Sequence, residues 1–410
     1  MGAAPRALVV GGSLGGLFAA NLLLRQGWDV EVFEQSARPL AGRGAGIITH
    51  PDLFAALGRI GIDINAGGGI GVDIDCRVTF DREGRELGRL AIPQCLTTWG
   101  RLHSLLLAAF PAGRHHLGHA CTAVEQDAAG VTAVFANGHR TRGDLLVAAD
   151  GIRSAVRAQF APAAQPGYAG YIAWRGLVEE GALSAATRRA LFPRFAFSLA
   201  PAEHMVGYPV AGFDNSVREG ERCFNFVWYR PAPAEGPSAV LPALCTDIEG
   251  RRHEMAIPPP LIRPQVIAAM REAARACLSP QFVEVVEKTR QPFFQAIFDL
   301  ESQVMHFGRV ALLGDAAFVA RPHVGMGVSK AAGDALSLAA ALAREPADPV
   351  AALRDYAAQR LRLGRAVIAH ARTLGAYLEA CAQGREDAGL RSRLHTPQAV
   401  MRDIAVTCDF

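Results

Sequence analysis

Three short segments rich in glycine or aspartate lie far apart in the chain, and each follows a run of apolar residues. They are Gly11-Gly12-Ser13-Leu14-Gly15-Gly16, Asp150-Gly151 and Gly314-Asp315. Glycines at such a turn allow the backbone to approach a pyrophosphate, and the free N–H groups of a following helix stabilise the negative charge. The first segment therefore predicts a dinucleotide-binding turn.

The residues around this turn fit a strand–helix–strand unit. Ala7–Val10 is a short apolar run, Leu17–Gln26 carries apolar residues at helical spacing, and Asp29–Phe33 alternates like a strand. Glu34, followed by Gln35, lies about twenty residues beyond the turn, where an acidic side chain binds ribose hydroxyls. A carboxylate at this position repels a 2′-phosphate, so we expect an adenosine ribose without one.

The same turn allows a second interpretation. Ser13 stands where the G-x-G-x-x-G pattern has its middle glycine, and Gly11–Gly15 also spells G-x-S-x-G, the nucleophile elbow of an α/β-hydrolase. Such an elbow needs an oxyanion-hole loop from an earlier strand, and ten residues precede this turn. We therefore expect dinucleotide binding rather than serine hydrolysis.

Composition argues against several function classes. Half of the 410 residues are hydrophobic, one fifth are charged, and the formal net charge is +3. This length suits two domains, and no basic run is interleaved with aromatic residues, so we expect no nucleic-acid partner. No apolar stretch reaches the roughly 20 residues that span a bilayer, and no apolar leader is visible, so we expect no membrane partner.

Cysteine and histidine spacing gives no indication of a metal site. The eight cysteines form no C-x-x-C pair, and His115, His116 and His119 have no Cys or carboxylate at ligand spacing. We therefore expect no metal, free thiols and a cytoplasmic location. We interpret these three histidines as solvated surface residues.

The pattern of predicted secondary structure changes once along the chain. Short strands alternate with helices at first, whereas from Ala161 proline-rich connectors join alternating strands that favour a mostly antiparallel sheet. Helical patterns follow over Pro264–Lys288, in an alanine-rich stretch through Leu342 and over Val350–Ala380, and the residues after Gly384 have no clear period.

The three glycine and aspartate segments should meet at one ligand. Parallel strands present their carboxyl ends at the same edge of a sheet, and Asp315 there can bind ribose or ribityl hydroxyls. Gly325 and Gly327 open a helix whose N-terminus would stabilise negative charge on an electron-poor ring. A reduced flavin carries such a charge at N1 and C2=O, and a nicotinamide does not.

These residues carry a family resemblance that covers the chain to about Ala380. The chain resembles the FAD-dependent aromatic hydroxylases, which are p-hydroxybenzoate-hydroxylase-like monooxygenases, through Gly11–Gly16 with Glu34, Ala149–Ser154 with Arg157, and Gly314–Ala317 with Pro322, Gly325 and Gly327. The chain departs from the family pattern at Trp99, Phe318 and Ser329, where an Arg, a His and an Asn are usual.

The resemblance implies an α/β fold with a Rossmann-like FAD-binding domain of the GR2 type, an inserted, mostly antiparallel substrate domain and C-terminal helices. We place the discontinuous FAD-binding domain at 1–75, 97–160 and 295–385, the substrate domain at 76–96 and 161–294, and a tail at 386–410. FAD would be reduced by NADH or NADPH, and O2 captured as a flavin C4a-hydroperoxide would oxygenate an electron-rich ring. A homodimer is compatible with this assignment.

The resemblance also assigns the FAD site. Arg43 and Arg101 are the two candidate arginines for a phosphate or ribose contact, and Ala45 and Gly46 would pass the flavin ring. The other expected FAD contacts are Gly11, Gly12, Ser13, Leu14, Gly15, Gly16, Glu34, Gln35, Asp150, Gly151, Asp315, Pro322, Gly325, Met326, Gly327 and Val328.

The substrate would be a small aromatic ring. Tyr168–Tyr171, Trp174–Gly176, Asn225–Tyr229 and Arg321–His323 resemble members of the family that hydroxylate 2,6-dihydroxypyridine, so we expect a hydroxypyridine. The alternatives are a phenolic acid such as salicylate, or a flavin oxidoreductase that does not insert oxygen. A flavin halogenase is disfavoured because its catalytic lysine has no counterpart before Lys288.

Hydroxylation needs a group that takes up the proton of a ring hydroxyl and walls that exclude water. Neutral His or Tyr side chains near the flavin suit this role. The candidates are His50, Tyr208, Tyr229, Gln295 and His323.

Overall fold

The computed structural model describes residues 4–40, 45–385 and 387–407. Within these ranges a six-stranded sheet has the order β16-β17-β10-β1-β2-β6. Its strands pair in parallel except β16 with β17. They span β1 (Arg6–Val10), β2 (Asp29–Phe33), β6 (His115–His116), β10 (Leu145–Ala148), β16 (His306–Phe307) and β17 (Val310–Leu312).

Helices cover this sheet because its central strands are apolar on both faces. Ala7–Val10 and Leu145–Ala148 are each at most 2% exposed, as expected for parallel strands buried between helices. The helices of this half and those beside it are α1 (Leu14–Arg25), α2 (Pro51–Ile60), α3 (Trp99–Ala108), α4 (Ala155–Phe160) and α9 (Gly327–Arg344). A small antiparallel sheet joins β7 (Cys121–Gln126), β8 (Val131–Phe135) and β9 (Arg140–Gly143).

A nine-stranded sheet forms the other half, in the order β18-β15-β11-β14-β13-β12-β4-β5-β3. All neighbours pair antiparallel except β12 with β4. The strands are β3 (Gly46–Ile48), β4 (Val72–Phe80), β5 (Glu86–Thr98), β11 (Gly167–Glu179), β12 (Arg194–Ala200), β13 (Glu203–Val210), β14 (Cys223–Pro231), β15 (Phe293–Glu301) and β18 (Phe318–Val319).

Side-chain alternation gives this sheet two different faces. Trp174, Trp228 and Phe226 lie on one face and pack with Phe282 and Val285 of a helical layer. That layer contains α5 (Ala185–Leu191), α6 (Leu241–Leu244), α7 (Pro264–Cys277) and α8 (Pro280–Lys288). The opposite face is therefore free to face the six-stranded half.

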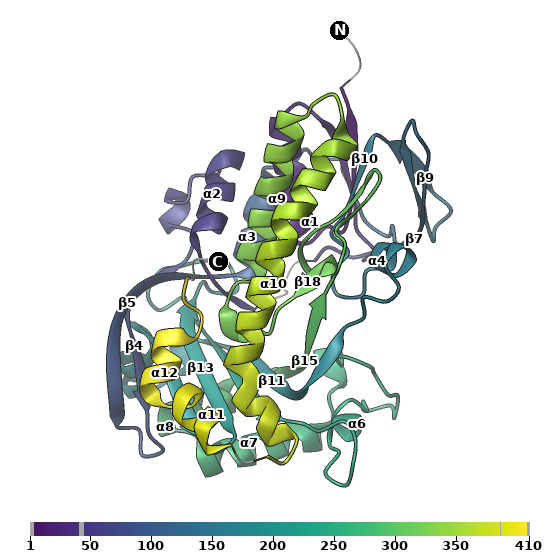
Figure 1. Cartoon of the computed structure of the whole chain (residues 1–410). Coiled ribbons are helices and arrows are strands. Elements are labelled where there is room, and N and C mark those ends of the chain that lie inside the picture. Colours follow the sequence, from purple (N-terminus) through teal and green to yellow (C-terminus); the bar gives the residue numbers. More distant parts are fainter. Residues whose placement is uncertain (1–3, 41–44, 386, 408–410) are drawn as a thin grey trace.

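One long helix ties the two halves together. α10 (Pro349–Ala382) contacts α9 and β17 in the first half and β11, β14 and β15 in the second. Figure 1 shows it running along the molecule between the two halves, with α11 (Ala388–Leu394) and α12 (Pro397–Asp403) beside the nine-stranded sheet. Phe318 packs against Gly364 of α10, where an added Cβ would lie 2.6 Å from the ring.

The predicted fold class is confirmed, and the predicted strand at Asp29–Phe33 matches β2 residue for residue. The helical pattern over Pro264–Lys288 is confirmed as two helices, which are separated where the chain leaves helical geometry before Pro280. One expectation differs. The residues after Gly384, which show no period, include α11 and α12.

The predicted domain boundaries stay a prediction. The nine-stranded sheet includes β3 and all of β4 and β5, which the prediction divided between the two domains. In the described residues no helix has the length and apolar character needed to cross a bilayer.

Two helical glycines test the close packing of the first turn. A Cβ on Gly16 would lie 1.9 Å from the Gly11 carbonyl oxygen, whereas the space around exposed Gly58 in α2 is open. We expect Gly16→Ala to lower the free energy of unfolding by at least about 2 kcal/mol. Gly58→Ala should leave it unchanged or raise it by roughly 0.5–1 kcal/mol. Urea unfolding of both variants tests this, and equal effects would contradict the packing argument.

Candidate active site

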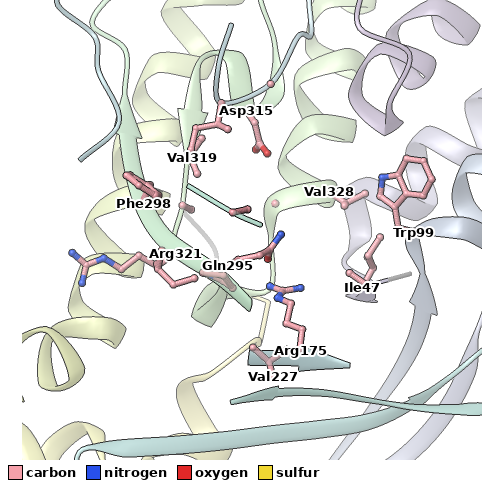
Figure 2. Close-up of a pocket in the computed structure, with 18 of the residues that line it drawn as sticks. Ile47, Trp99, Arg175, Val227, Gln295, Phe298, Asp315, Val319, Arg321 and Val328 are labelled. Atoms are coloured by element: carbon pink, nitrogen blue, oxygen red, sulfur yellow. The ribbon is translucent and has the colours of Figure 1, made fainter. Parts of the chain in front are cut away.

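A cavity of about 830 Å³ lies between the two halves. The carboxyl ends of β1, β10 and β17 contribute Ser13, Gly151 and Asp315 to its wall. The free face of the nine-stranded sheet closes it from the other side. Figure 2 shows Asp315 and Val328 on one side of the cavity and Arg175 and Val227 on the other. The three segments far apart in sequence therefore meet, as predicted.

The first turn has the close backbone approach that a pyrophosphate site requires. Gly11 has φ of 110°, and a Cβ there would lie 2.2 Å from the Ala149 carbonyl oxygen. Ser13, Leu14 and Gly15 line the cavity at the start of α1, whereas Gly11, Gly12 and Gly16 lie behind them. This cradle, which no larger residue could form, fits a dinucleotide.

Glu34 lies next to this turn but is not among the residues that line the cavity, so its contact with the ribose stays a prediction. It is 6% exposed, and its carboxylate accepts hydrogen bonds from the backbone N–H of Gly12 (2.9 Å) and of Ser36 (2.8 Å). Gln35 is exposed and does not line the cavity.

The interpretation of His115 as a solvated surface residue is wrong. Its Nε2 is buried and has no hydrogen-bond partner among the residues that the structure covers, and a Cβ on Gly12 would lie 2.4 Å from that atom. Burial lowers the pKa of His115, and the nearby Glu34 carboxylate partly opposes the shift. The strand β6 beside β2 brings it there, a pairing that no local pattern indicates.

Buried charges hold the third segment in place. Lys330 donates to the Gly314 carbonyl (3.1 Å), and the Asp334 carboxylate accepts from Gly314 N–H (3.0 Å) and from Arg360 (2.6 Å). Burial works against ionisation of Asp334, but Lys330 and Arg360 outweigh it and lower its pKa. Asp315 lines the cavity, and burial raises its pKa against the opposing charge of Lys330.

The expected flavin-facing residues lie together. Pro322, Gly325, Met326, Gly327 and Val328 line the cavity at the start of α9. Ala45 and Gly46 also line the cavity, and Ile48 of the same segment packs beside Gly325. A Cβ on Gly46 would lie 2.6 Å from Tyr208 and from Asn225, whose amide oxygen accepts from the Gly46 N–H (2.9 Å).

Three of the five catalytic candidates line the cavity. Tyr208 and Tyr229 come from β13 and β14, and Gln295 comes from β15. All three project from the free face of the sheet, among apolar Phe195 and Val227. Burial raises the pKa of Tyr208 to about 12, against an opposing effect of Arg175. The pKa of Tyr229 is raised in the same way.

His323 and His50 lie behind the cavity wall. His323 is fully buried, its Nε2 lies 2.8 Å from Tyr171 Oη, and its ring centroid lies 4.2 Å from that of Tyr229. Burial lowers its pKa to about 3. His50 is 3% exposed, and its Nε2 lies 3.2 Å from the Gly325 carbonyl oxygen. Neither residue lines the cavity, so a direct role for either stays a prediction.

The remaining predicted cofactor residues lie away from the cavity surface. Arg101 donates to the carbonyls of Gly69 and Asn215. Asp150 accepts from Val156 N–H (3.3 Å) at the start of α4, and burial raises its pKa. Neither is among the lining residues, and Arg43 lies outside the described residues.

Sequence reasoning missed several lining residues. Trp99 lines the cavity, donates from Nε1 to Ser13 Oγ (3.3 Å) and stacks on His103. Its place where the family pattern has an arginine was the one available signal. Arg175 also lines the cavity, and Arg153, Arg251 and Arg252 lie exposed at its edge.

The C-terminal segment forms part of the wall as well. Ile404 and Ala405 line the cavity, and Ala405 N–H donates to the His323 carbonyl (2.8 Å). The fully buried Arg77 of β4 holds this segment through the carbonyls of Met401 (3.0 Å), Ala405 (2.7 Å) and Ile404. No sequence pattern indicates these non-local contacts. In the parts of the chain that the structure covers, no group of His, Cys, Asp and Glu could hold a metal ion.

This cavity, with a glycine cradle at one end and an aromatic slot at the other, defines a class of flavoprotein. The chain belongs to the FAD-dependent aromatic-ring monooxygenases, and FAD is its cofactor. Residues 168–299 match a family model described as FAD binding domain-like, and residues 269–371 match one described as FAD binding domain.

Individual relatives support the family assignment. The chain is 30% identical over 375 residues to the 2,6-dihydroxypyridine 3-monooxygenase of Paenarthrobacter nicotinovorans. The aligned region covers 91% of this chain and 91% of that protein. The structure of 2,6-dihydroxypyridine-3-hydroxylase from Arthrobacter nicotinovorans matches with a TM-score of 0.84 and 28% identity, covering 95% of this chain and 96% of that one. Klebsiella pneumoniae HpxO, complexed with FAD and uric acid, matches with a TM-score of 0.72 and 26% identity over 97% and 96%.

The Arg77 contacts can be tested by removing the guanidinium at nearly constant volume. We expect Arg77→Met to lower the free energy of unfolding by about 2–4 kcal/mol, because three buried carbonyls lose a charged donor. Amide hydrogen exchange of residues 397–407 should accelerate in the holoenzyme. Arg89→Met is the control. It breaks an exposed ion pair between Arg89 and Glu86, which both lie on β5, the strand beside β4. This change should lower the free energy of unfolding by less than about 0.5 kcal/mol. Unchanged exchange in Arg77→Met would contradict the proposed contacts.

Buried neutral histidines should make the fold acid-sensitive. The pKa of His323 is lowered to about 3 and that of His50 to about 4, from 6.5, chiefly by burial. As pH falls below about 6.5 the unfolded chain takes up protons that the folded chain does not, so stability falls by up to about 1.4 kcal/mol per pH unit for each histidine.

A substitution at His323 measures how much this residue contributes to the loss of stability at low pH. Urea unfolding of His323→Asn between about pH 6.5 and about 4.5 should show a loss of stability that is about 2 kcal/mol smaller than that of the wild type. Tyr171→Phe removes the hydrogen bond to His323 but keeps the imidazole, so its pH slope should match the wild type. Equal slopes in all three proteins would show that His323 is not held neutral.

Proposed function

We propose that the chain is a single-component monooxygenase that hydroxylates a hydroxypyridine such as 2,6-dihydroxypyridine, using NADH or NADPH and O2. The observation that carries this proposal is the single cavity that joins the glycine cradle to a slot walled by Tyr208, Tyr229 and Gln295. The relative that is 30% identical over 91% of the chain and acts, by its name, on 2,6-dihydroxypyridine supports the choice of ring.

The cofactor-binding residues follow from the cradle. The turn Ser13–Gly15 would hold the pyrophosphate, Glu34 the adenosine ribose and Asp315 the ribityl chain. The start of α9 at Gly327 would face the pyrimidine side of the flavin ring and favour negative charge there. When bound, FAD supplies reduction and activation of oxygen. The proposed FAD-binding domain comprises 1–75, 97–160 and 295–385, and the proposed substrate-binding domain comprises 76–96 and 161–294.

The slot residues position the ring and exclude water. Phe195, Val206 and Val227 provide apolar walls that suit a flat ring. Tyr208 and Tyr229 remain protonated at neutral pH because burial raises the pKa of both phenols, so each can donate a hydrogen bond to a ring oxygen. Gln295 offers both an amide donor and an acceptor. These contacts would hold one ring carbon at a fixed place relative to the flavin.

Two alternative functions can be distinguished by the substrate that the protein turns over and the product that it forms. A phenolic acid such as salicylate would also fit an aromatic slot that contains an arginine. A flavin oxidoreductase would consume NADH without adding oxygen to the ring.

The test follows NADH oxidation and product mass with the purified yellow protein. We expect 2,6-dihydroxypyridine to accelerate NADH oxidation and to yield a product heavier by one oxygen. Faster oxidation with no oxygenated product would favour the oxidoreductase, and turnover of salicylate alone would favour the phenolic acid. If no ring compound accelerates NADH oxidation, the hydroxypyridine proposal is wrong.

The slot itself can be tested with two matched substitutions. Tyr229→Phe removes a hydroxyl inside the slot, and we expect kcat/KM for the ring to fall by roughly tenfold to a hundredfold, the cost of a buried hydrogen bond. Tyr168→Phe removes a hydroxyl that donates to the Ala232 carbonyl (2.7 Å) outside the cavity lining, and serves as the control. Equal losses in both would mean that Tyr229 acts through stability.

A further inference from the structure

Arg175 lines the cavity and has no partner of opposite charge among the described residues. Within this part of the chain its buried Nε has no hydrogen-bond partner, and no carboxylate lies within ion-pair distance of it. Arg321, a buried arginine of the wall, differs, because it pairs with Asp299 and Glu379 at 2.8 Å each. Figure 2 shows Arg175 and Gln295 directed into the same space, while the end of Arg321 points away from it. The slot therefore contains one unbalanced positive charge.

The position of Arg175 in the sheet places this charge at the ring slot. Arg175 on β11 lies opposite Val227 of β14 and Phe293 of β15, and Tyr229 and Gln295 lie opposite Ala173, two residues earlier on the same face. Its charge also acts on Tyr208 and Tyr229, whose side chains line the slot. These two phenols are neutral hydrogen-bonding groups and do not balance the charge of the guanidinium.

A partly desolvated cation is stabilised by an anion that enters with it. The flavin is not the expected counter-ion, because the start of α9 at Gly327 lies at the opposite wall and is placed to stabilise charge on the ring. The substrate is the remaining group that reaches this part of the cavity. A planar guanidinium donates two parallel hydrogen bonds, which fits the O–C–N edge of an ionised hydroxypyridine or the two oxygens of a carboxylate.

We propose that Arg175 binds the substrate as a singly charged anion, through a ring oxyanion or a carboxylate. This inference rests on the proposed function, since it names the ionisation state of that substrate. A ring held as its oxyanion is already electron-rich, so the proton is lost before binding and no base inside the slot has to accept it. This agrees with His323 and His50, which lie behind the wall.

Binding, measured by the change in flavin absorbance of the holoenzyme, tests the inference without turnover. The probes are 2,6-dihydroxypyridine above and below its first ionisation, and benzoate against benzamide, which share a ring but differ in charge. We expect the wild type to prefer the anionic form of at least one pair. Arg175→Gln should weaken binding of that anion by roughly tenfold to a hundredfold and leave the neutral probe nearly unchanged.

Two matched variants serve as controls. Arg175→Lys keeps the charge but loses the bidentate geometry, so it should keep part of the preference. Arg153→Gln removes an exposed charge of the same sign at the cavity edge, and the preference should persist there. Preference for benzoate alone would identify a carboxylate substrate, and preference for ionised dihydroxypyridine alone would identify the ring oxyanion.

Three results would overturn the inference. The first is a wild-type protein that binds neither anion better than its neutral counterpart. The second is an Arg175→Gln variant that keeps the wild-type preference for the anion. The third is an Arg175→Gln variant that retains less flavin while its anion preference stays the same. Anion-selective binding without any ring-stimulated NADH oxidation would instead overturn the proposed function and leave the anion site in place.

Discussion

The contact between the Gly11 turn and the Ala149 carbonyl sets the geometry on which the rest of the site depends. These two backbone segments follow β1 and β10, whose parallel pairing brings their carboxyl ends to one edge. A side chain at Gly11 would separate them, and one at Gly16 would displace the Gly11 turn itself, because backbone atoms already fill both spaces. The cradle for FAD is therefore formed by the absence of side chains, and its shape follows from strand register.

Alternation along the second sheet provides the opposite wall. Even-numbered residues of β11 such as Trp174 pack into the helical layer, so Ala173 and Arg175 lie on the opposite face, where Arg175 lines the cavity. A shift of register by one residue would exchange the two sets and place tryptophan in the slot. The buried Trp174 and Trp228 thus fix which side chains can meet a substrate.

Local signals made the core of this arrangement predictable. Glycine spacing, short apolar runs and the strand ends at Gly11, Asp150 and Gly314 are all local, and the parallel sheet brings them together as expected. What could not be predicted depends on contacts between distant segments. His115 lies beside the glycine turn through strand pairing, and His323 lies behind Tyr229 although its loop reaches the cavity.

The C-terminal segment is the clearest case of such a non-local feature. α11 has no buried residue, so its sequence carries no apolar period to detect. α12 does bury Ala399, Val400 and Met401, but a helix of seven residues is too short to show a clear period. Its end is also held by a guanidinium from β4, more than three hundred residues earlier in the chain. Patterns read along a sequence indicate long elements with a regular apolar face, and they miss short elements whose contacts are all with distant segments.

The arginines of the cavity region differ in how their charge is balanced. Arg77 is fully buried and is satisfied by helix-end carbonyls and Gln94, which act as dipoles, and burial lowers its pKa to about 10. Arg321 is balanced by two carboxylates. Arg175 has neither kind of partner among the described residues, although its Nε is also buried. Since burying an uncompensated charge opposes folding, such a residue is best explained by a ligand that completes it.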